Sequence, residues 1–399
     1  MKILFVLSNL YVEGNGLSVS ARRTIKTLRD AGQDVRVLSG ENPKHGGPEP
    51  EYKLKRFIFP IVQPIIDHNG FCFAKSDPKI IEEAVRWADV VHVEEYFPLQ
   101  HRAILMAEKL GKPVTATYHL HPENILYQLG IHWSWPNRVL LKYWRRRIYN
   151  HCNRIQCPTE NVYDRLMRYH IHAQFKVISN GVIPDTCIRP ITPPDNYFDD
   201  NRPLDVIYIG RFSVEKDQPT LLEAMRYSAF NQRIRLHFAG QGPRKNALVK
   251  HAQRLVKEGV LKYEPVFQFH TRDELRELAA HADLAIHCAT IEVEGLSIME
   301  AMQQAVVPVI AYGHHTGTPQ FALTAKSTFP KKNPEALAER IDYWLSHPKE
   351  RWEMGFRYAE SMKQYDIRES ANQLIEMFGL AIRDQQYLNA YKQPNTLDK

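Results

Sequence analysis

Several features that would assign this 399-residue sequence to a class are missing from it. No window approaches the ~18 consecutive apolar residues of a membrane-spanning helix. The opening apolar run, residues 3–7, breaks at Ser8-Asn9 without a small-residue cleavage pattern, so it predicts a buried strand and not a signal peptide. The five cysteines are odd in number and lack metal-ligand spacing, which argues against a disulfide framework or a zinc site. We therefore expect a cytoplasmic protein in which any membrane contact is peripheral, on the inner face of the cell membrane.

Two nucleotide-related motifs are also absent. The loop Gly14-Asn15-Gly16 follows the first apolar run, but the third glycine of the G-x-G-x-x-G fingerprint would fall at Val19. The loop therefore fits a tight turn without a ligand as well as it fits a phosphate site. No Asp-x-Asp motif occurs anywhere, so an enzyme acting on sugar nucleotides would need side-chain cations and helix ends in place of a divalent metal.

The charge balance is basic, at +7. It favours anionic partners without distinguishing nucleotides, phospholipid headgroups and nucleic acid. No recognisable nucleic-acid-binding module is present, so we expect no nucleic-acid partner. With 44% hydrophobic and 24% charged residues, the chain is globular and long enough for two domains.

Short apolar runs alternate with helical patterns, which predicts an α/β fold with two doubly wound, Rossmann-like lobes. Strands of the first lobe are predicted at 3–7, 35–38, 89–93 and 113–119, with helices at 18–31 and 99–110. Strands of the second lobe are predicted at 205–209, 235–239, 266–269, 285–287 and 307–310, with a helix at 218–227. After Pro334 a helical pattern continues almost to Asn389.

Prolines clustered at 183–203 suggest a linker between the lobes. We predict one domain at 1–182, a linker at 183–204, a second domain at 205–365, and a terminal helix at 366–392 that packs back on the first domain. Ligands of doubly wound sheets bind at the carboxyl ends of the strands, so a cleft between the facing lobes is the expected active site.

The segment from Glu292 to Glu300 is the most informative part of the sequence. It predicts a loop entering a helix, with Gly295 and Ser297 at the entrance and Glu300 about one turn inside. The first amides of a helix lack partners within it and lie at its positive end, which suits a diphosphate. One carboxylate can then meet a sugar hydroxyl and the other a ribose diol. Taken alone, an ordinary surface helix with acidic residues explains the segment equally well.

Three further residues are candidates by position. Arg211 and Lys216 follow a predicted strand of the second lobe at a spacing from which both could reach one diphosphate and offset charge on a leaving group. His119 ends a strand of the first lobe, where it could donate to a substrate oxygen. In isolation, solvated surface cations and a structural histidine are the more common explanations.

The stretch from Arg138 to Arg154 contains basic residues and no acid. At helical spacing its apolar residues share one face. Those residues are Leu140, Leu141, Trp144, Ile148 and Cys152. Such a helix could rest on an anionic bilayer, although the apolar face of a helix more often packs on its own sheet.

Taken together, these motifs resemble glycosyltransferase family 4, retaining enzymes of the GT-B fold. The resemblance covers nearly the whole chain, and Glu292-x7-Glu300 with Gly295 is its most specific part. The supporting matches, in order along the chain, are Asn15-Gly16, Asp89–Val93, Thr117–His119, Ser179–Val182, Gly210–Phe212 with Glu215-Lys216, and Gly240–Pro243.

The resemblance implies a nucleoside-diphosphate-sugar donor held by the second domain and an acceptor held by the first. By motif position, Glu300 would hold the ribose, Glu292 the donor sugar, and Arg211 with Lys216 the diphosphate. The implied catalytic residues are His119, Arg211, Lys216 and Glu292. The implied donor-binding residues are Gly16, Arg211, Lys216, Glu292, Gly295, Leu296, Ser297 and Glu300. We expect no metal and no cofactor beyond the donor, with UDP-hexose favoured over GDP-hexose.

The first lobe is similar to diacylglycerol glycosyltransferase-like members, in part through Phe71–Lys75, which implies a lipid or lipid-linked glycan as acceptor. The chain departs from the family pattern at Gln33, Glu94, Glu294 and Ala305. Glu294 matters most, since an added carboxylate beside the donor would alter sugar choice or repel the diphosphate.

Two other functions are compatible with the sequence. The first is a two-lobed sugar-nucleotide epimerase or phosphorylase. The second is a non-catalytic protein that binds nucleic acid or an anionic membrane through its basic charge, which predicts salt-sensitive polyanion binding and no donor turnover.

Overall fold

The computed structural model describes residues 1–8, 10, 16–41, 49–58, 63, 73–127, 130–131 and 133–392. Gly14-Asn15 and Phe71-Cys72 lie outside these ranges, so the predictions made for them are not addressed by the structure. The chain divides into two compact units. Unit 1 comprises Met1–Pro122, Trp133–Asn180 and Ile367–Lys399, and unit 2 comprises Glu123–His132 and Gly181–Asp366.

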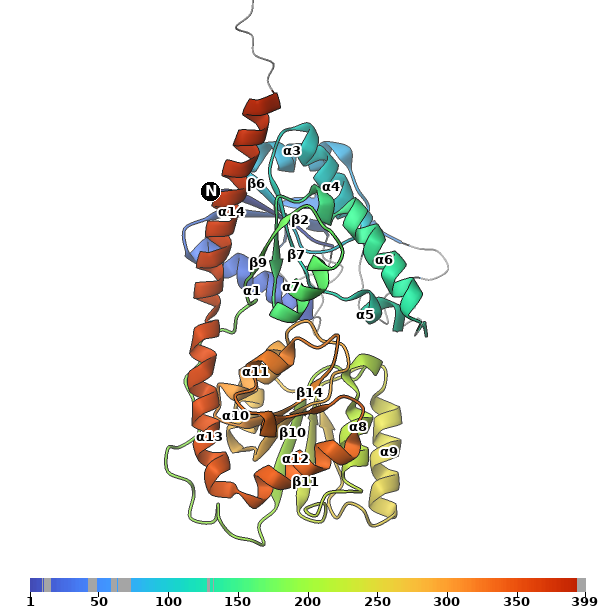
Figure 1. Cartoon of the computed structure of the whole chain (residues 1–399), viewed down its shortest axis with the longest axis vertical. Helices are drawn as coiled ribbons and strands as arrows, with labels where there is room; N and C mark the ends of the chain where they lie inside the picture. Colours follow the sequence, from blue (N-terminus) through green and yellow to red (C-terminus); the bar gives the residue numbers. More distant parts are fainter. Residues whose placement is uncertain are drawn as a thin grey trace, which may run out of the picture. The chain divides into compact units, whose positions relative to one another are not determined.

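Unit 1 is built on a parallel sheet of seven strands in the order β3-β2-β1-β6-β7-β8-β9 (Figure 1). The strands are β1 (Lys2–Val6), β2 (Asp34–Gly40), β3 (Tyr52–Leu54), β6 (Val90–Val93), β7 (Val114–Thr117), β8 (Arg154–Cys157) and β9 (Gln174–Val177). A short antiparallel pair, β4 (Arg56–Phe57) with β5 (Phe73–Ala74), stands beside it. The main helices are α1 (Gly16–Asp30), α3 (Pro78–Trp87), α4 (Pro98–Lys109), α6 (Ser134–Arg147), α7 (Glu160–Met167) and α14 (Ile367–Lys392).

Helices cover both faces of this sheet because the chain moves outward from β1 in one direction and from β6 in the other. Helix α14 packs beside α1 and completes one side of the core (Figure 1). Leu374, Met377 and Phe378 of α14 are fully or almost fully buried with Phe5 of β1. The last helix of the chain is therefore part of the core around the first strand.

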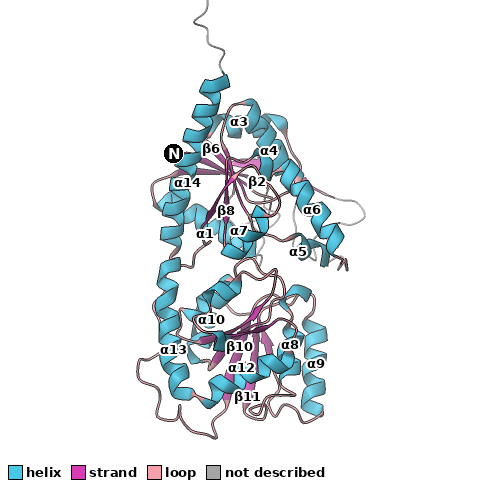
Figure 2. Cartoon of the chain, viewed as in Figure 1, coloured by secondary structure: helices cyan, strands magenta, loops and turns pink. Residues whose placement is uncertain are grey.

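Unit 2 contains a parallel sheet of six strands in the order β12-β11-β10-β13-β14-β15 (Figure 2). The strands are β10 (Leu204–Ile209), β11 (Ile234–Ala239), β12 (Val266–Gln268), β13 (Leu284–His287), β14 (Val307–Tyr312) and β15 (Thr328–Pro330). The helices are α8 (Gln218–Ala224), α9 (Lys245–Lys257), α10 (Arg272–His281), α11 (Leu296–Met302), α12 (Pro334–Ser346) and α13 (Pro348–Ser361).

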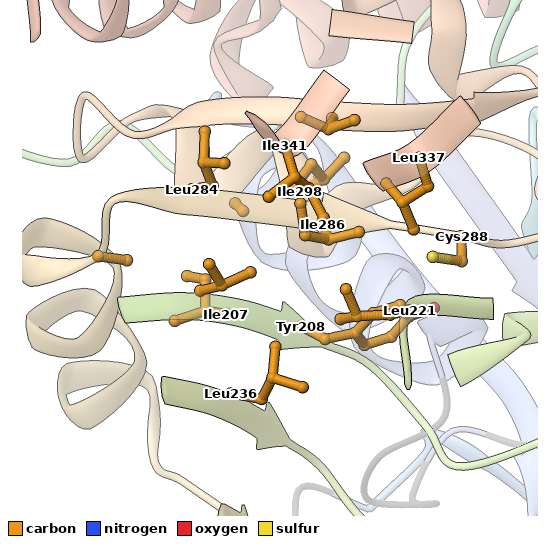
Figure 3. Packing of buried hydrophobic residues seen from close by; sticks show 14 of the residues in the cluster. Ile207, Tyr208, Leu221, Leu236, Leu284, Ile286, Cys288, Ile298, Leu337 and Ile341 are labelled. Carbon is orange, nitrogen blue, oxygen red and sulfur yellow. The ribbon is translucent and has the colours of Figure 1, made fainter. Parts of the chain in front are cut away.

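The core of unit 2 forms where branched aliphatic side chains of the central strands meet the apolar sides of the helices (Figure 3). The cluster includes Ile207 of β10, Ile286 of β13, Ile298 of α11 and Ile341 of α12, all at most 4% exposed. Both central strands are buried on both faces, as parallel strands covered by helices must be. Their carboxyl ends are thereby held in fixed positions.

The α/β fold with two doubly wound sheets is confirmed, and the predicted strands reappear within a few residues. The predicted linker residues 183–204 belong to unit 2, where buried Arg189 donates from Nε to the carbonyl oxygen of Ala280 at 2.9 Å. The exact domain limits stay a prediction.

The prediction for 138–154 requires a correction. Helix α6 begins earlier, at Ser134, and ends at Arg147, before a short 3₁₀ turn at Tyr149–His151. Leu141, Trp144, Ile148 and Cys152 are buried in unit 1, because the apolar face packs inward. That face is not available to a membrane, and the opposite face is the one that solvent reaches.

None of the helices among the described residues combines the length and the apolar character that crossing a bilayer requires.

Candidate donor site and histidine cluster

Each sheet has a topological switch point, where strand order reverses and the loops after two neighbouring strands diverge. In unit 2 this point lies between β10 and β13. Arg211 follows β10, Lys216 lies in the 3₁₀ turn Val214–Lys216, and Glu292 follows β13. The three charged residues that the sequence singled out are therefore positioned at the edge where such sheets bind ligands.

Lys216 and Glu292 form an ion pair, with side chains only 19% and 16% exposed. The loop that carries Lys216 is fixed by the buried Tyr208, whose hydroxyl donates to the Lys216 carbonyl oxygen. His287, the last residue of β13, places Nε2 3.5 Å from the Glu292 carboxylate. The same ring nitrogen lies 3.5 Å from the hydroxyl of buried Thr318.

The backbone of Glu292 is held from both directions. Its N–H donates to the His315 carbonyl oxygen, and its carbonyl oxygen accepts from the N–H of Gly317, each at 2.8 Å. Burial alone would raise the pKa of Glu292, but the charge of Lys216 and the hydrogen bond from His287 outweigh it and lower the pKa to about 2. Glu292 is therefore a carboxylate, an acceptor of hydrogen bonds, at any physiological pH.

The pKa of His287 is also lowered, but for an imidazole this favours the neutral form. Burial lowers the pKa of this imidazole, the carboxylate of Glu292 raises it, and the ammonium of Lys216 lowers it again, with a net decrease. A neutral ring carries one N–H and one lone pair. His287 can thus donate to Glu292 without adding a second charge to the cluster.

Helix α11 begins as predicted, with Gly295 at the N-cap and Glu300 one turn inside. Gly295 has φ of +94°, and a Cβ there would lie 2.8 Å from the Thr318 hydroxyl oxygen, so only glycine fits. The hydroxyl of Ser297 donates to the Ile209 carbonyl oxygen at 3.1 Å and ties the helix to the end of β10. The first amides, those of Leu296 and Ser297, have no acceptor within the helix.

The loop of Arg211 is fixed by a close approach of two strand ends. A Cβ on Gly240, after β11, would lie 2.0 Å from the Gly210 carbonyl oxygen, which excludes any side chain. Phe212 N–H donates to the Gln241 carbonyl oxygen at 2.9 Å, and the Gln218 side chain donates to the Arg211 carbonyl oxygen at 2.8 Å. The backbone of Arg211 is therefore rigid although its side chain is half-buried.

In unit 1 the switch point lies between β1 and β6, and a second charged cluster follows β6 and β7. His119 has a side chain only 6% exposed and contacts the Glu94 carboxylate through Nε2. The other oxygen of Glu94 lies 3.3 Å from Nε2 of the buried His92. Burial alone would raise the pKa of Glu94, but electrostatic attraction to His119 and hydrogen bonds from His119 and His92 outweigh it and lower the pKa. A carboxylate thus sits between two imidazoles.

For a neutral His92 ring, the hydrogen-bond pattern selects one tautomer. Thr117 donates its hydroxyl to the Gln156 side-chain oxygen at 2.6 Å, so it accepts from His92 Nε2 at 3.0 Å. Nδ1 of His92 then accepts from the Thr115 hydroxyl at 2.9 Å. His92 Nε2–H points between Thr117 and Glu94, which leaves the remaining capacity of the carboxylate for His119.

The backbone at His119 is fixed by Tyr96, whose hydroxyl oxygen accepts from the N–H of His119 at 2.8 Å and of Leu120 at 3.3 Å. Burial raises the pKa of Tyr96, so the phenol stays protonated. With the backbone held and Nε2 directed at Glu94, the His119 ring has one orientation, and Nδ1 is left as its second polar atom.

The structure brings most of the predicted donor residues together. Lys216 contacts Glu292, Ser297 reaches the end of β10 beside Arg211, and Leu296, Gly295 and Glu300 share α11 with Ser297. Gly16, the first residue of α1, and His119 belong to unit 1 and are placed by that unit alone.

Two groups were not singled out by the sequence as site residues. His287 and Glu94 both stand at or directly after the carboxyl end of a parallel strand, which was the available signal.

The Glu294 side chain is buried. The pKa of Tyr365 is raised by burial and, as the second cause, by the negative charge of Glu294. Glu294 is therefore an interior residue of unit 2.

Comparisons with known proteins agree with this geometry. The Glycosyltransferase Family 4 model matches residues 14–186, and the Glycosyl transferases group 1 model matches residues 194–361. The chain belongs to glycosyltransferase family 4. In this family 4 glycosyltransferase, the range matched by the first model includes His119, and the range matched by the second includes Lys216 and Glu292.

Curated relatives include the alpha-monoglucosyldiacylglycerol synthase of Streptococcus pneumoniae, 26% identical over 235 residues, which are 57% of this chain and 52% of the relative. They also include the sulfoquinovosyl transferase of Arabidopsis thaliana, 24% identical over 324 residues, which are 77% of this chain and 58% of the relative. The glycosyltransferase spans about half the length of these relatives.

Solved structures with similar folds include Anabaena HepE in complex with UDP, with TM-score 0.69, 17% identity, and coverage of 95% of this chain and 100% of that chain. The sucrose-phosphate synthase of Thermosynechococcus elongatus has TM-score 0.71 and 16% identity, with coverage of 96% and 99%. These similarities confirm the GT-B fold of the glycosyltransferase.

Proposed function

We propose that this chain is a retaining, metal-independent hexosyltransferase that moves a hexose from a UDP-sugar to a lipid or lipid-linked glycan. The name of one curated relative, an alpha-monoglucosyldiacylglycerol synthase, supports a lipid acceptor. The UDP bound by the similar Anabaena protein supports the nucleotide. Unit 2 would bind the donor, and unit 1 would hold the acceptor.

One observation carries the proposal: the Lys216–Glu292 ion pair at the β10/β13 switch point, beside the start of α11. A carboxylate held as an anion suits a sugar hydroxyl, and an ammonium next to it suits a phosphate. A diphosphate at Lys216 would share the ammonium with Glu292, so the sugar and its leaving group are recognised by two ends of one charge pair. Arg211 would add the second cation.

The proposed reaction replaces one bond at the anomeric carbon with another on the same face. The bond from that carbon to the diphosphate oxygen breaks, and its electron pair leaves with the diphosphate. Arg211 and Lys216 offset this negative charge, in place of a metal ion. The acceptor hydroxyl forms the new bond, and its proton passes to an oxygen of the leaving diphosphate, so no separate base is required.

The experiment that tests the donor is protection against thermal unfolding by UDP- and GDP-sugars, with and without EDTA. A ligand that binds only the folded chain raises the transition temperature as its concentration exceeds its dissociation constant. We expect UDP-hexoses to protect best and EDTA to have no effect. Protection by no sugar nucleotide would refute the donor assignment, and loss of protection in EDTA would refute metal independence.

A product assay separates the alternative functions. Incubation with a UDP-hexose and diacylglycerol vesicles should give a glycolipid that retains the anomeric configuration of the donor. Conversion of the donor to its epimer without acceptor would indicate an epimerase, and phosphate-dependent release of sugar from a glycan would indicate a phosphorylase. Polyanion binding without donor turnover would indicate the non-catalytic alternative.

A further inference from the structure

Helix α6 of unit 1 has two unlike faces. Asn137, Leu141 and Trp144 are buried on one of them. At 100° per residue, the direction opposite to this face contains Trp135, Val139, Lys142 and Arg146. The outward face of α6 is thus a continuous stripe of about three turns.

The outward face of α6 and its N-cap residue expose large apolar side chains. Trp133 is 68% exposed, Trp135 61%, Val139 57% and Tyr143 52%. Two tryptophans and a tyrosine within the eleven residues 133–143 are exposed to solvent and are not explained by packing within unit 1. Tryptophan and tyrosine combine an apolar ring with one polar group, a combination that favours the boundary between water and lipid.

Cations lie among and after these apolar residues. Arg138, Lys142, Arg146 and Arg147 are exposed. Arg145 points elsewhere and donates to the Tyr169 carbonyl oxygen at 2.8 Å. No acidic residue occurs between Trp133 and Arg154, so no charge within this segment offsets these cations.

Figure 1 shows α6 along the side of unit 1 away from α14. Glu108 of α4 is an acid near the end of this helix, and it pairs with His151, after α6, at 2.6 Å. Among the described residues, none of the four exposed cations forms an ion pair, so the stripe remains positively charged. The complementary surface is one that is negatively charged and into which tryptophan side chains can insert.

We propose that the outward face of α6, residues Trp133 to Arg147, docks on an anionic phospholipid bilayer. Trp133, Trp135 and Tyr143 would enter the headgroup region, and Lys142 and Arg146 would meet lipid phosphates. The inference rests on the proposed function only for its purpose, which is to bring the enzyme to a lipid acceptor. A protein partner with an acidic surface would match the cations but gives no reason for the exposed aromatic rings.

The test is flotation of the full chain with vesicles of phosphatidylcholine alone or mixed with phosphatidylglycerol. We expect the chain to float with the anionic vesicles and to be released as salt is raised, because exposed charges are screened. Lys142→Glu combined with Arg146→Glu should reduce the bound fraction about ten-fold or more. The matched control reverses two exposed lysines on α9 of unit 2, Lys245→Glu with Lys250→Glu, and should float normally.

A second pair of variants tests the exposed tryptophan residues. Trp133→Ser with Trp135→Ser should weaken flotation and remove quenching of tryptophan fluorescence by brominated lipid chains. The control, Tyr387→Ser with Tyr391→Ser, changes two exposed aromatic residues of α14, at 78% and 94%, and should leave both readouts unchanged.

The outcomes separate this inference from the proposed function, because flotation needs no donor and donor protection needs no vesicle. Normal protection by UDP-sugars with no flotation would overturn the docking surface alone. Equal loss of flotation in the α6 and α9 charge variants would overturn it too, since it would show binding by net charge. Failure to float together with α6-dependent capture on immobilised polyglutamate would assign the surface to an acidic protein instead.

Discussion

Replacing Glu292 by glutamine tests the charge balance of the donor site. The carboxylate contacts Lys216 and lies 3.5 Å from His287, with its side chain 16% exposed. Glutamine keeps the shape and one carbonyl oxygen but has no charge, so it imitates the protonated acid. It leaves the ammonium of Lys216 without its counter-ion in a site from which much of the water is excluded.

The magnitude follows from the pKa of Glu292, which is lowered from 4.5 to about 2 in the folded chain. Since the folded value is the lower one, the carboxylate stabilises the fold above pH 4.5, and this contribution is lost as the pH falls from 4.5 toward 2. Multiplying the lowering by the free energy per pKa unit gives about 3 kcal/mol near neutral pH. Near pH 3 the same linkage leaves about 1 kcal/mol.

The assay is urea unfolding of the wild-type chain and of Glu292→Gln, followed by tryptophan fluorescence near pH 7 and near pH 3. We expect the variant to be less stable by up to about 3 kcal/mol at the higher pH and by less than half of that at the lower one. The matched control is Glu277→Gln on α10, whose side chain is 64% exposed, and it should change stability by less than about 0.5 kcal/mol. A variant no less stable than this control, or a difference that does not shrink in acid, would refute the reasoning.

Three further changes have separate readouts. Glu94→Gln should cost roughly 1–3 kcal/mol in urea unfolding, and ¹⁵N NMR should show His119 losing its fixed Nε2 proton; an unchanged ring spectrum would contradict the proposed orientation. Gly295→Ala should destabilise the chain by about 1–3 kcal/mol because φ is +94° and the new methyl meets Thr318, and Thr318→Ala should restore only part of the loss; full restoration would exclude the backbone term. Glu300→Ala should raise the Kd for UDP about ten-fold or more, as loss of a charged hydrogen bond predicts, while its unfolding should be unchanged. The Kd is measured by calorimetric titration, and an unaltered value would exclude Glu300 from the site.

The order of strands and helices was accessible from the sequence because both sheets are parallel and buried on both faces. Runs such as 205–209 and 307–310 are short, apolar and separated by helical patterns. Few folds other than a parallel sheet covered by helices fit such an alternation. The start of α11 was predicted from Gly295 and Ser297 at the entrance of a helical pattern, and the structure places Gly295 at the N-cap. These features depend on local sequence, and local sequence predicted them.

The partners of the charged residues were not accessible in the same way. Lys216 and Glu292 are separated by 76 positions, and only the adjacency of β10 and β13 brings them together. Glu94 was noticed as a departure from the family pattern, but its contact with His119 depends on the pairing of β6 with β7. Sequence reasoning located the strand ends and could not foresee which side chains would meet there.

Helix α6 shows a different limit. The apolar spacing correctly indicated one face, but periodicity alone does not say whether that face is buried or presented to lipid. In the structure Leu141 and Trp144 are buried, so the face exposed to solvent is the one that the pattern indicated as polar. Ala305 is similar: glycine is common at this family position, and the structure gives the reason, a φ of +57°.

The placement of α14 has a consequence for how the chain is made. Leu374, Met377 and Phe378 pack with Ile3 and Phe5, so residues from the two ends of the sequence occupy one hydrophobic interior. On the ribosome the first sheet emerges early, and part of its apolar surface stays uncovered until residues 367–392 have been translated. A nascent or prematurely terminated chain lacking this helix would expose that surface, and chaperones and proteases would recognise the unfinished domain long before any catalytic defect mattered.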